Sequence, residues 1–355
     1  MAETATIFIP DISGYTDFIS KTEIDHNSLV IRTLITTIIE ANSINLTVSE
    51  VEGDAVLFYR KGPPVPMDQM IDQVLMMYRG FHQALDMLNR TKLCPCAACK
   101  SLSMLTLKFI AHYGMIQEIS YSNFNKASGK DMIIAHRLMK NRLPTHEYVL
   151  ISRDYLDAAG SPRHDELQWH SAEEEYPGIG NVSFEYSTLE KIKESIPELP
   201  PLELPPATEF GDAVETEIET PFLFAYCTII DIGNRAQWMH GVTAVDGDPV
   251  AHIGSKHSCI SNEFRVDVYP VKAETSDDEA LFLERREFPG SGLRLLFESR
   301  FRKISEDRTL ARMRILQLND APLPADFAGA ALASMKSSLA NLKAMCEQGG
   351  REIAA

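Results

Sequence analysis

Short apolar stretches and longer amphipathic stretches alternate through the first half of the chain. The apolar run that begins at Phe8 predicts a strand, and apolar residues recur at helical spacing over residues 29–40. Residues 48–59 alternate on both sides of Gly53, which predicts a hairpin that turns at this glycine. A second helical period covers residues 67–88. The predicted order is strand, helix, hairpin, helix.

The same signals continue to residue 189. They predict strands at 105–115, 147–152 and 183–189, and a helix over 130–140. A Ser/Asn-rich stretch at 120–128 is expected to be a connection without regular structure. We therefore expect an α+β sandwich in which helices pack on a sheet.

Five prolines interrupt this pattern between residues 195 and 212, with acidic and apolar residues among them. Such a run favours an extended, semi-rigid polyproline conformation. We interpret residues 195–212 as a linker between a first domain, residues 1–194, and a second domain, residues 213–355. The alternative interpretation is a proline-rich ligand for a partner protein.

Strand-like patterns dominate after this segment. Residues 213–220 alternate as a strand, and helical stretches follow at 221–231 and 235–242. Four or five alternating runs then fill residues 250–318. A helix with apolar residues on one face covers 325–348. The second half is therefore predicted to be an antiparallel sheet followed by a long helix.

Composition narrows the function. The chain has 355 residues, 45% of them hydrophobic, which is enough for two separate cores. Its net charge of −16 divides into −9 before Pro206 (27 acidic and 18 basic residues) and −7 after it, so neither half offers a basic face to nucleic acid. No stretch approaches the roughly 20 apolar residues that a membrane span needs, and no secretion signal is visible. We expect a cytoplasmic protein that is not an integral membrane protein.

Two aspartates, Asp11 and Asp54, stand at the edges of predicted strands. Carboxylates that neighbouring strands bring side by side form an oxygen-rich site suited to Mg²⁺ or Mn²⁺. The alternative is structural: Asp11 would cap a helix that starts near Ser13, and Gly53 with Asp54 would form only a hairpin turn.

Three of the six cysteines, Cys94, Cys96 and Cys99, lie close together. Thiolates at this spacing can supply three ligands of a tetrahedral Zn²⁺ site, which His82, His112 or a second subunit would complete. The alternative is a loop of small residues. The other cysteines stand singly among apolar residues and are expected to be packing residues.

Residues 5–190 contain three blocks that resemble the catalytic domain of class III adenylyl and guanylyl cyclases. The blocks are DISGYT at 11–16 after a strand, EVEGD at 50–54 in a hairpin, and HYG at 112–114 followed by GKDMIIAHRL at 129–138. The resemblance implies a ferredoxin-like sandwich that acts as a homodimer and binds a nucleoside triphosphate with Mg²⁺ or Mn²⁺.

The same resemblance implies roles for single residues. Asp11, the backbone carbonyl of Ile12, and Asp54 fall at metal-binding positions, and Arg137 falls at the position of a transition-state arginine. Ile133 stands where the family has a transition-state asparagine, and it cannot donate a hydrogen bond to the ribose. Loss of one such contact typically costs on the order of 10²–10³ in rate. We therefore expect a degenerate cyclase-like domain.

The resemblance also places Glu50 and Gly53 at nucleotide-binding positions. Guanylyl cyclases carry a purine-reading glutamate at the place of Glu50, whereas adenylyl cyclases carry a lysine. The second base-reading position lies near Lys126. The choice between ATP and GTP stays open.

Residues 213–348 resemble the START-like helix-grip (SRPBCC) superfamily, which includes polyketide cyclases and plant pollen allergens. The resemblance rests on the order of elements and on a short WMHGV motif at 238–242. It implies a cavity that binds a hydrophobic small molecule or lipid near Trp238 and His257. The alternative is a cavity filled by the domain's own side chains.

Together these features predict a ligand-binding signalling protein with a degenerate nucleotide-cyclase-like domain. Two enzymatic alternatives stay open. One is an active purine nucleotide cyclase regulated by the second domain. The other is a polyketide-cyclase-type enzyme that uses His252 and His257 for acid and base chemistry.

Overall fold

The computed structural model describes residues 2–20, 24–93, 102–121, 124–161, 164–200, 206–247, 252–262, 264–318, 323 and 326–353. Contacts divide the chain into two compact units. The first unit comprises residues 1–89 and 100–200, and the second comprises residues 90–99 and 201–355. Each unit has its own sheet and its own core.

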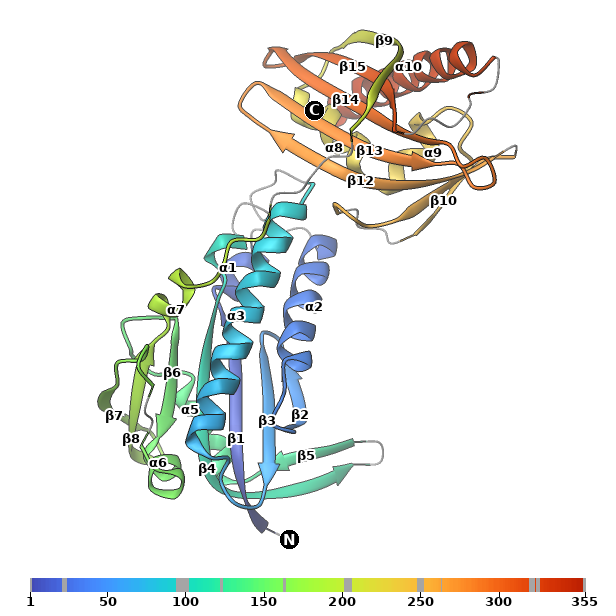
Figure 1. Ribbon diagram of the computed structural model, residues 1–355. Helices are drawn as coiled ribbons and strands as arrows, with labels where there is room; N and C mark the ends of the chain where they lie inside the picture. The colour runs from blue at the N-terminus through green and yellow to red at the C-terminus, as the bar shows by residue number, and fades with distance from the viewer. Residues whose placement is uncertain are drawn as a thin grey trace. The chain divides into compact units, whose positions relative to one another are not determined.

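The first unit is built around one mixed sheet (Figure 1). Its strands are β1 Ala2–Ser13, β2 Thr47–Glu52, β3 Ala55–Lys61, β4 Thr106–Tyr121, β5 Phe124–Ser128, β6 Tyr148–Ser152, β7 His170–Tyr176 and β8 Gly180–Thr188. Its helices are α1 Tyr15–Ser20, α2 Ile24–Glu40, α3 Met67–Thr91, η1 Leu102–Met104, α5 Lys130–Leu138, α6 Arg153–Ala159 and α7 Glu190–Glu194.

The strands lie in the order β2-β3-β1-β4-β6-β8-β7, and β5 pairs with β4 outside this path. β1 is antiparallel to both of its neighbours, β3 and β4, whereas β4 and β6 are parallel. The stretch expected to be a connection at 120–128 instead holds the end of β4 and the whole of β5. Its Ser, Asn and Lys residues hid the strand because they are typical of loops.

β1 is buried on both faces of this sheet. Ala5, Ile7 and Ile9 join a core that includes residues of α5, whereas Phe8 and Ile12 join a core made with α1, α2 and α3. Side chains alternate along a strand, so each face of β1 packs against a different layer. This explains why β1 reads as a continuous apolar run in the sequence.

The second unit contains an antiparallel sheet and three α-helices among its described residues. Its strands are β9 Thr208–Ile218, β10 Ala244–Gly247, β11 His257–Ile260, β12 Arg265–Thr275, β13 Glu279–Glu287, β14 Arg294–Ser305 and β15 Arg308–Gln317. Its helices are α8 Phe222–Ile230, η2 Ile232–Asn234, α9 Arg235–Trp238 and α10 Phe327–Ile353.

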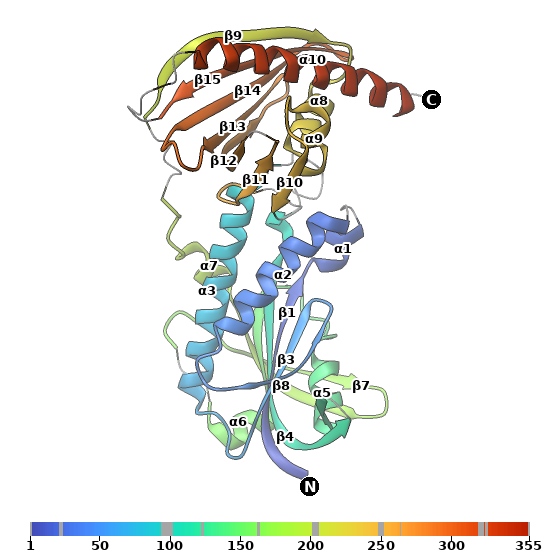
Figure 2. The same ribbon diagram turned by 90° about the vertical axis from the view of Figure 1, so that its right-hand side faces the viewer.

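The strand order in the second unit is β10-β11-β12-β13-β14-β15-β9. Figure 2 shows α8, α9 and α10 on one side of this sheet. The core lies between the helices and that face of the sheet, where residues such as Tyr226, Val268 and Leu339 are buried together. The helix-grip assignment itself stays a prediction.

A short segment at the C-terminal end of α3 belongs to the second unit by its contacts. The hydroxyl of Tyr226 donates to the carbonyl oxygen of Leu93 at 2.5 Å, and the amide of Ile253 donates to the carbonyl oxygen of Thr91 at 2.8 Å. Leu93 is also buried in the core of the second unit. Among the described helices, none is long and apolar enough to cross a membrane.

Candidate metal and nucleotide site

The predicted metal aspartates lie on neighbouring parts of the first sheet. Asp11 is in β1 and faces Ala55 of β3, the residue that follows Asp54. The amide of Ile12 donates to the carbonyl oxygen of Asp54 at 3.0 Å, which fixes the hairpin against β1. Asp11 does not occupy the helix-cap position, because β1 continues to Ser13 and α1 begins only at Tyr15.

The turn that carries Asp54 depends on a glycine. Glu52 pairs with Ala55, so Gly53 and Asp54 form the two-residue loop between β2 and β3. Gly53 has φ +62°, which is the left-handed region where a side chain is unfavourable. The hairpin predicted at Gly53 is therefore present, and Gly53 serves as its turn residue.

A lysine that the sequence analysis did not single out completes this group. Lys108 of β4 is the cross-strand partner of Asp11, and its Nζ lies 3.0 Å from Asp11 Oδ2. Burial, followed by repulsion from Asp11, raises the pKa of Asp54. The ammonium group of Lys108 therefore balances the charge of Asp11, whereas the charged form of Asp54 remains unfavourable. A divalent cation would relieve that cost, and carboxylate oxygens are suitable ligands for Mg²⁺ or Mn²⁺.

The two positions predicted to read the base, Glu50 and Lys126, also lie together. Lys126 Nζ of β5 is 2.8 Å from Glu50 Oε2 of β2, and the amide of Ala127 donates to Ser49 Oγ at 3.1 Å. The other carboxylate oxygen of Glu50, Oε1, is buried without a hydrogen-bond partner among the described residues. The sequence does not show that these residues are neighbours, because β2 and β5 are far apart along the chain and come together only in the folded unit.

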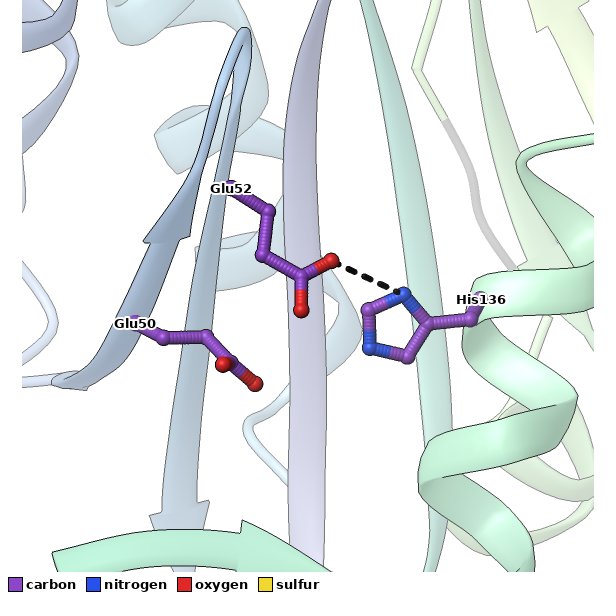
Figure 3. A group of neighbouring side chains, drawn as sticks. All are labelled: Glu50, Glu52 and His136. Carbon is purple, nitrogen blue, oxygen red and sulfur yellow. Dashed lines mark ion pairs between the residues drawn. The ribbon is translucent and has the colours of Figure 1, made fainter.

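Glu50 also belongs to a group with Glu52 and His136 (Figure 3). One ligand atom from each residue lies within 4.8 Å of the others, and Glu52 Oε2 is 3.8 Å from His136 Nδ1. Glu52 is exposed, and Lys126 already neutralises Glu50. Ion pairs within the unit account for this group, and we assign no metal to it.

Helix α5 carries Ile133 and Arg137, the two positions that the cyclase resemblance predicts to act in the transition state. Ile133 is 55% exposed, and Arg137, one helical turn later, is also exposed. Residues four apart share one face of a helix, so Ile133 and Arg137 point out of the first unit on the same face. Both side chains therefore point away from the sheet to which Asp11 belongs.

Residues of the third sequence block, HYG at 112–114 and GKDMIIAHRL at 129–138, hold α5 against β4. Asp131, in the first turn of α5, accepts a hydrogen bond from the amide of Met115 at 2.6 Å. His112 Nε2 lies 3.3 Å from its other oxygen, and the hydrogen bond from His112 is the main cause that lowers the pKa of Asp131. A Cβ on Gly114 would lie 2.3 Å from Asp131 Cγ. Gly114 is therefore required by this close approach.

Ser152, His112 and Asp131 superficially resemble a hydrolytic triad. Ser152 Oγ lies 2.7 Å from His112 Nδ1, and it also accepts a hydrogen bond from the amide of Tyr155 as the N-cap of α6. Ser152 and His112 are fully buried. No substrate can reach this hydroxyl, so the arrangement joins β4, β6, α5 and α6 and carries no nucleophilic chemistry.

The predicted zinc ligands Cys94, Cys96 and Cys99 lie outside the described residues. Both histidines considered as a fourth ligand have partners within the first unit. His82 Nε2 is 3.2 Å from Glu147 Oε1, and His112 lies between Ser152 and Asp131. The zinc site stays a prediction.

The two residues predicted to line a ligand cavity lie in the core of the second unit. Trp238 of α9 is 2% exposed and His257 of β11 is 1% exposed. Burial, with a contribution from the charge of Arg235, lowers the pKa of His257 to about 3, so its imidazole is neutral at neutral pH. His252 lies elsewhere, with Nδ1 3.1 Å from the carbonyl oxygen of Ile253.

Known sequences match part of the chain. A family model described as "Protein of unknown function (DUF2652)" matches residues 31–148. The uncharacterized protein Rv2561/Rv2562 of Mycobacterium tuberculosis is 27% identical over 119 residues, which is 34% of this chain. The match spans 55% of the length of that relative.

Solved structures similar to this chain include nucleotide cyclases. The guanylyl cyclase Cya2 is 13% identical, with a TM-score of 0.40 over 53% of this chain and 92% of that chain. The adenylyl cyclase CyaB from P. aeruginosa is 13% identical, with a TM-score of 0.40 over 53% of this chain and 94% of that chain. The guanylate cyclase domain of RhGC from Catenaria anguillulae, in complex with GTP, is 19% identical, with a TM-score of 0.38 over 53% of this chain and 98% of that chain. These neighbours are class III cyclase catalytic domains.

Proposed function

We propose that the first unit is a nucleotide-cyclase-like signalling domain that binds a divalent metal ion and a purine nucleoside triphosphate. One observation carries the proposal: Asp11 and Asp54 meet on paired parts of one sheet, where burial and mutual repulsion raise the pKa of Asp54. Perturbed carboxylates of this kind cluster at functional sites.

The donor set fits Mg²⁺ or Mn²⁺. Asp11 and Asp54 supply carboxylate oxygens, and the carbonyl of Ile12 is the proposed third ligand. A bound divalent ion would supply the positive charge that holds a triphosphate. Lys108 pairs with Asp11 in the metal-free chain. Displaced by the metal, its ammonium group would be available to phosphate oxygens.

Glu50 and Lys126 offer complementary hydrogen bonds to a purine. The carboxylate of Glu50 accepts from ring or exocyclic N–H groups, and the ammonium of Lys126 donates to ring nitrogens or a carbonyl oxygen. Gly53 holds the hairpin that presents Glu50. Because the two side chains pair with each other at 2.8 Å, a purine has to separate them before it binds.

Cyclisation is proposed to be weak or lost. Ile133 has no polar atom to stabilise the ribose in the transition state, although Arg137 is retained on the same exposed face of α5. We also propose a homodimer, in which this exposed face of α5 would pack against the nucleotide site of the partner subunit. The exposed apolar side chain of Ile133 on this face supports a partner there.

For the second unit we propose binding of a hydrophobic small molecule or lipid, as the helix-grip resemblance implies. A core enclosed between a sheet and three helices, with Trp238 and His257 inside it, supports this proposal. A ligand there would alter nucleotide affinity only by favouring one arrangement of the dimer over another.

The proposal is tested by titrating ATP and GTP into the full chain by calorimetry, with and without Mn²⁺. We expect Mn²⁺-dependent binding that Asp54→Asn abolishes and that Asp72→Asn, an exposed carboxylate on α3, leaves unchanged. Absence of metal-dependent binding would reject the proposal. A cyclic product formed at ordinary cyclase rates in the same mixtures would favour the active cyclase instead.

A further inference from the structure

The core of the second unit contains a buried group of charged side chains. Arg235 of α9 and Arg286 of β13 both bind the carboxylate of Glu284. Arg235 Nη1 lies 3.0 Å from Glu284 Oε1, and Arg286 Nε lies 2.7 Å from the same oxygen. Arg235 is fully buried and Glu284 is 3% exposed. Burying three charges among apolar residues is costly and needs an explanation.

His257 and Trp238 lie in the same group. His257 of β11, Val268 of β12 and Arg286 of β13 form one cross-strand row, so their side chains share the face of the sheet that looks toward the helices. The guanidinium of Arg235 lies 5.7 Å from the centre of the Trp238 ring. The group therefore joins β11, β13 and α9 around one point.

Four polar atoms in this group are buried without a hydrogen-bond partner among the described residues. They are Arg235 Nε, Trp238 Nε1, and both ring nitrogens of His257. Buried polar atoms in native proteins are nearly always paired, and each exception calls for an unseen partner. Three of these atoms are donors, because a neutral imidazole offers one N–H and one acceptor.

The net charge of this group determines which kind of ligand would fit it. Arg235 and Arg286 carry two positive charges against one negative charge on Glu284, while His257 is neutral. A net positive charge with three free donors matches an acidic oxygen group. The surrounding side chains, such as Val266 and Phe282, are apolar. A ligand that fits has an acidic end and an apolar body.

We propose that Arg235, Trp238 and His257 form the binding site for the acidic head group of an apolar small molecule in the second unit. The proposal deepens and rests on the ligand binding proposed above for this unit. A carboxylate or a phosphate ester supplies the same acceptor oxygens, and the experiment distinguishes the two.

The test compares three probes with the same twelve-carbon chain on the full-length protein: dodecanoate, dodecyl phosphate and dodecanol. Calorimetry is run below the micelle concentration of each probe. We expect at least one acidic probe to bind about tenfold or more tightly than dodecanol, since hydrogen bonds to charged groups are the stronger ones. The acid that binds more tightly identifies the head group.

Two variants test the residues, and one serves as a control. His257→Leu and Trp238→Phe each remove unpartnered polar atoms while keeping an apolar side chain, and we expect each to weaken the acidic probe about tenfold without weakening dodecanol. His240→Leu makes the same chemical change at an exposed histidine, and we expect no effect. Trp238→Phe decides the question if His257→Leu fails to fold.

The outcomes separate the two proposals. Equal binding of dodecanol and both acids, or unchanged affinity of the acids in both variants, would overturn the head-group site and leave apolar ligand binding intact. Failure of all three probes to bind would reject the head-group site together with the ligand binding on which it rests. Neither result bears on nucleotide binding by the first unit.

Discussion

Replacing His257 by leucine should remove a pH-dependent part of the stability of the second unit. The imidazole is buried, and its pKa falls from an ordinary value of 6.5 to about 3. Between these values the unfolded chain binds a proton that the folded chain does not bind. The stability due to neutral His257 is therefore fully present above pH 6.5 and is lost as the pH falls toward 3.

The magnitude follows from the size of this change. One pH unit is worth about 1.4 kcal/mol per proton, so His257 should destabilise the wild type by about 2 kcal/mol between pH 7 and pH 5. The full interval would give about 5 kcal/mol, but many carboxylates also titrate below pH 5. The range from pH 7 to pH 5 is therefore the informative one.

The assay uses the two tryptophans of the chain, Trp169 in the first unit and Trp238 in the second. In a Trp169→Phe background, Trp238 fluorescence during urea unfolding reports on the second unit. Wild type should lose about 2 kcal/mol more than His257→Leu between pH 7 and pH 5. His240→Leu, at an exposed position, should follow the wild type. Parallel pH profiles of wild type and His257→Leu would refute the reasoning.

Three further outcomes are expected. Gly114→Ala should destabilise the first unit by about 1–3 kcal/mol in urea unfolding, because the added Cβ would meet the Asp131 carboxyl group. Gly80→Ala in α3 is the control and should be neutral or stabilising. Equal effects of the two substitutions would contradict the packing argument. Lys108→Met should strengthen Mn²⁺ binding without nucleotide by roughly tenfold in calorimetry, since the ammonium competes with the metal for a carboxylate; unchanged or weaker binding would count against the site. Elemental analysis should find about one zinc per chain bound by the cysteines at 94–99, and less than about half an equivalent would argue against that site.

Local patterns were sufficient to predict the elements that position Asp11 and Asp54, the proposed metal ligands. β1 and the hairpin at Gly53 have strong apolar periodicity and a glycine turn, and both are present. Lys108 was missed because its pairing with Asp11 depends on the register of β1 against β4, which are about a hundred residues apart in sequence. Local pattern carries no information about such a register.

The buried charges of the second unit could not be predicted from the sequence for a different reason. Glu284 and Arg286 lie in the run ERRE, which is typical of a solvent-exposed strand face. Glu284 is buried because Arg235, 49 residues earlier, reaches it from α9. Arg286, two residues further along β13, also binds Glu284, but the second cation comes from α9, and no window of sequence around β13 contains Arg235.

The contacts of Thr91 with Ile253 and of Leu93 with Tyr226 affect both the order in which the two units can fold and whether they can be separated. The chain passes from one unit to the other three times, near residues 90, 100 and 201. During synthesis Leu93 emerges 133 residues before Tyr226, its hydrogen-bond partner, which is a delay of roughly 7–27 s at ordinary translation rates. Proteolysis between residues 200 and 206 would leave the C-terminal fragment without Leu93, which is buried in the core of the second unit. The second unit is thus not a module that can be excised at the proline-rich segment, and its shortest self-sufficient form has to include residues from the middle of the first.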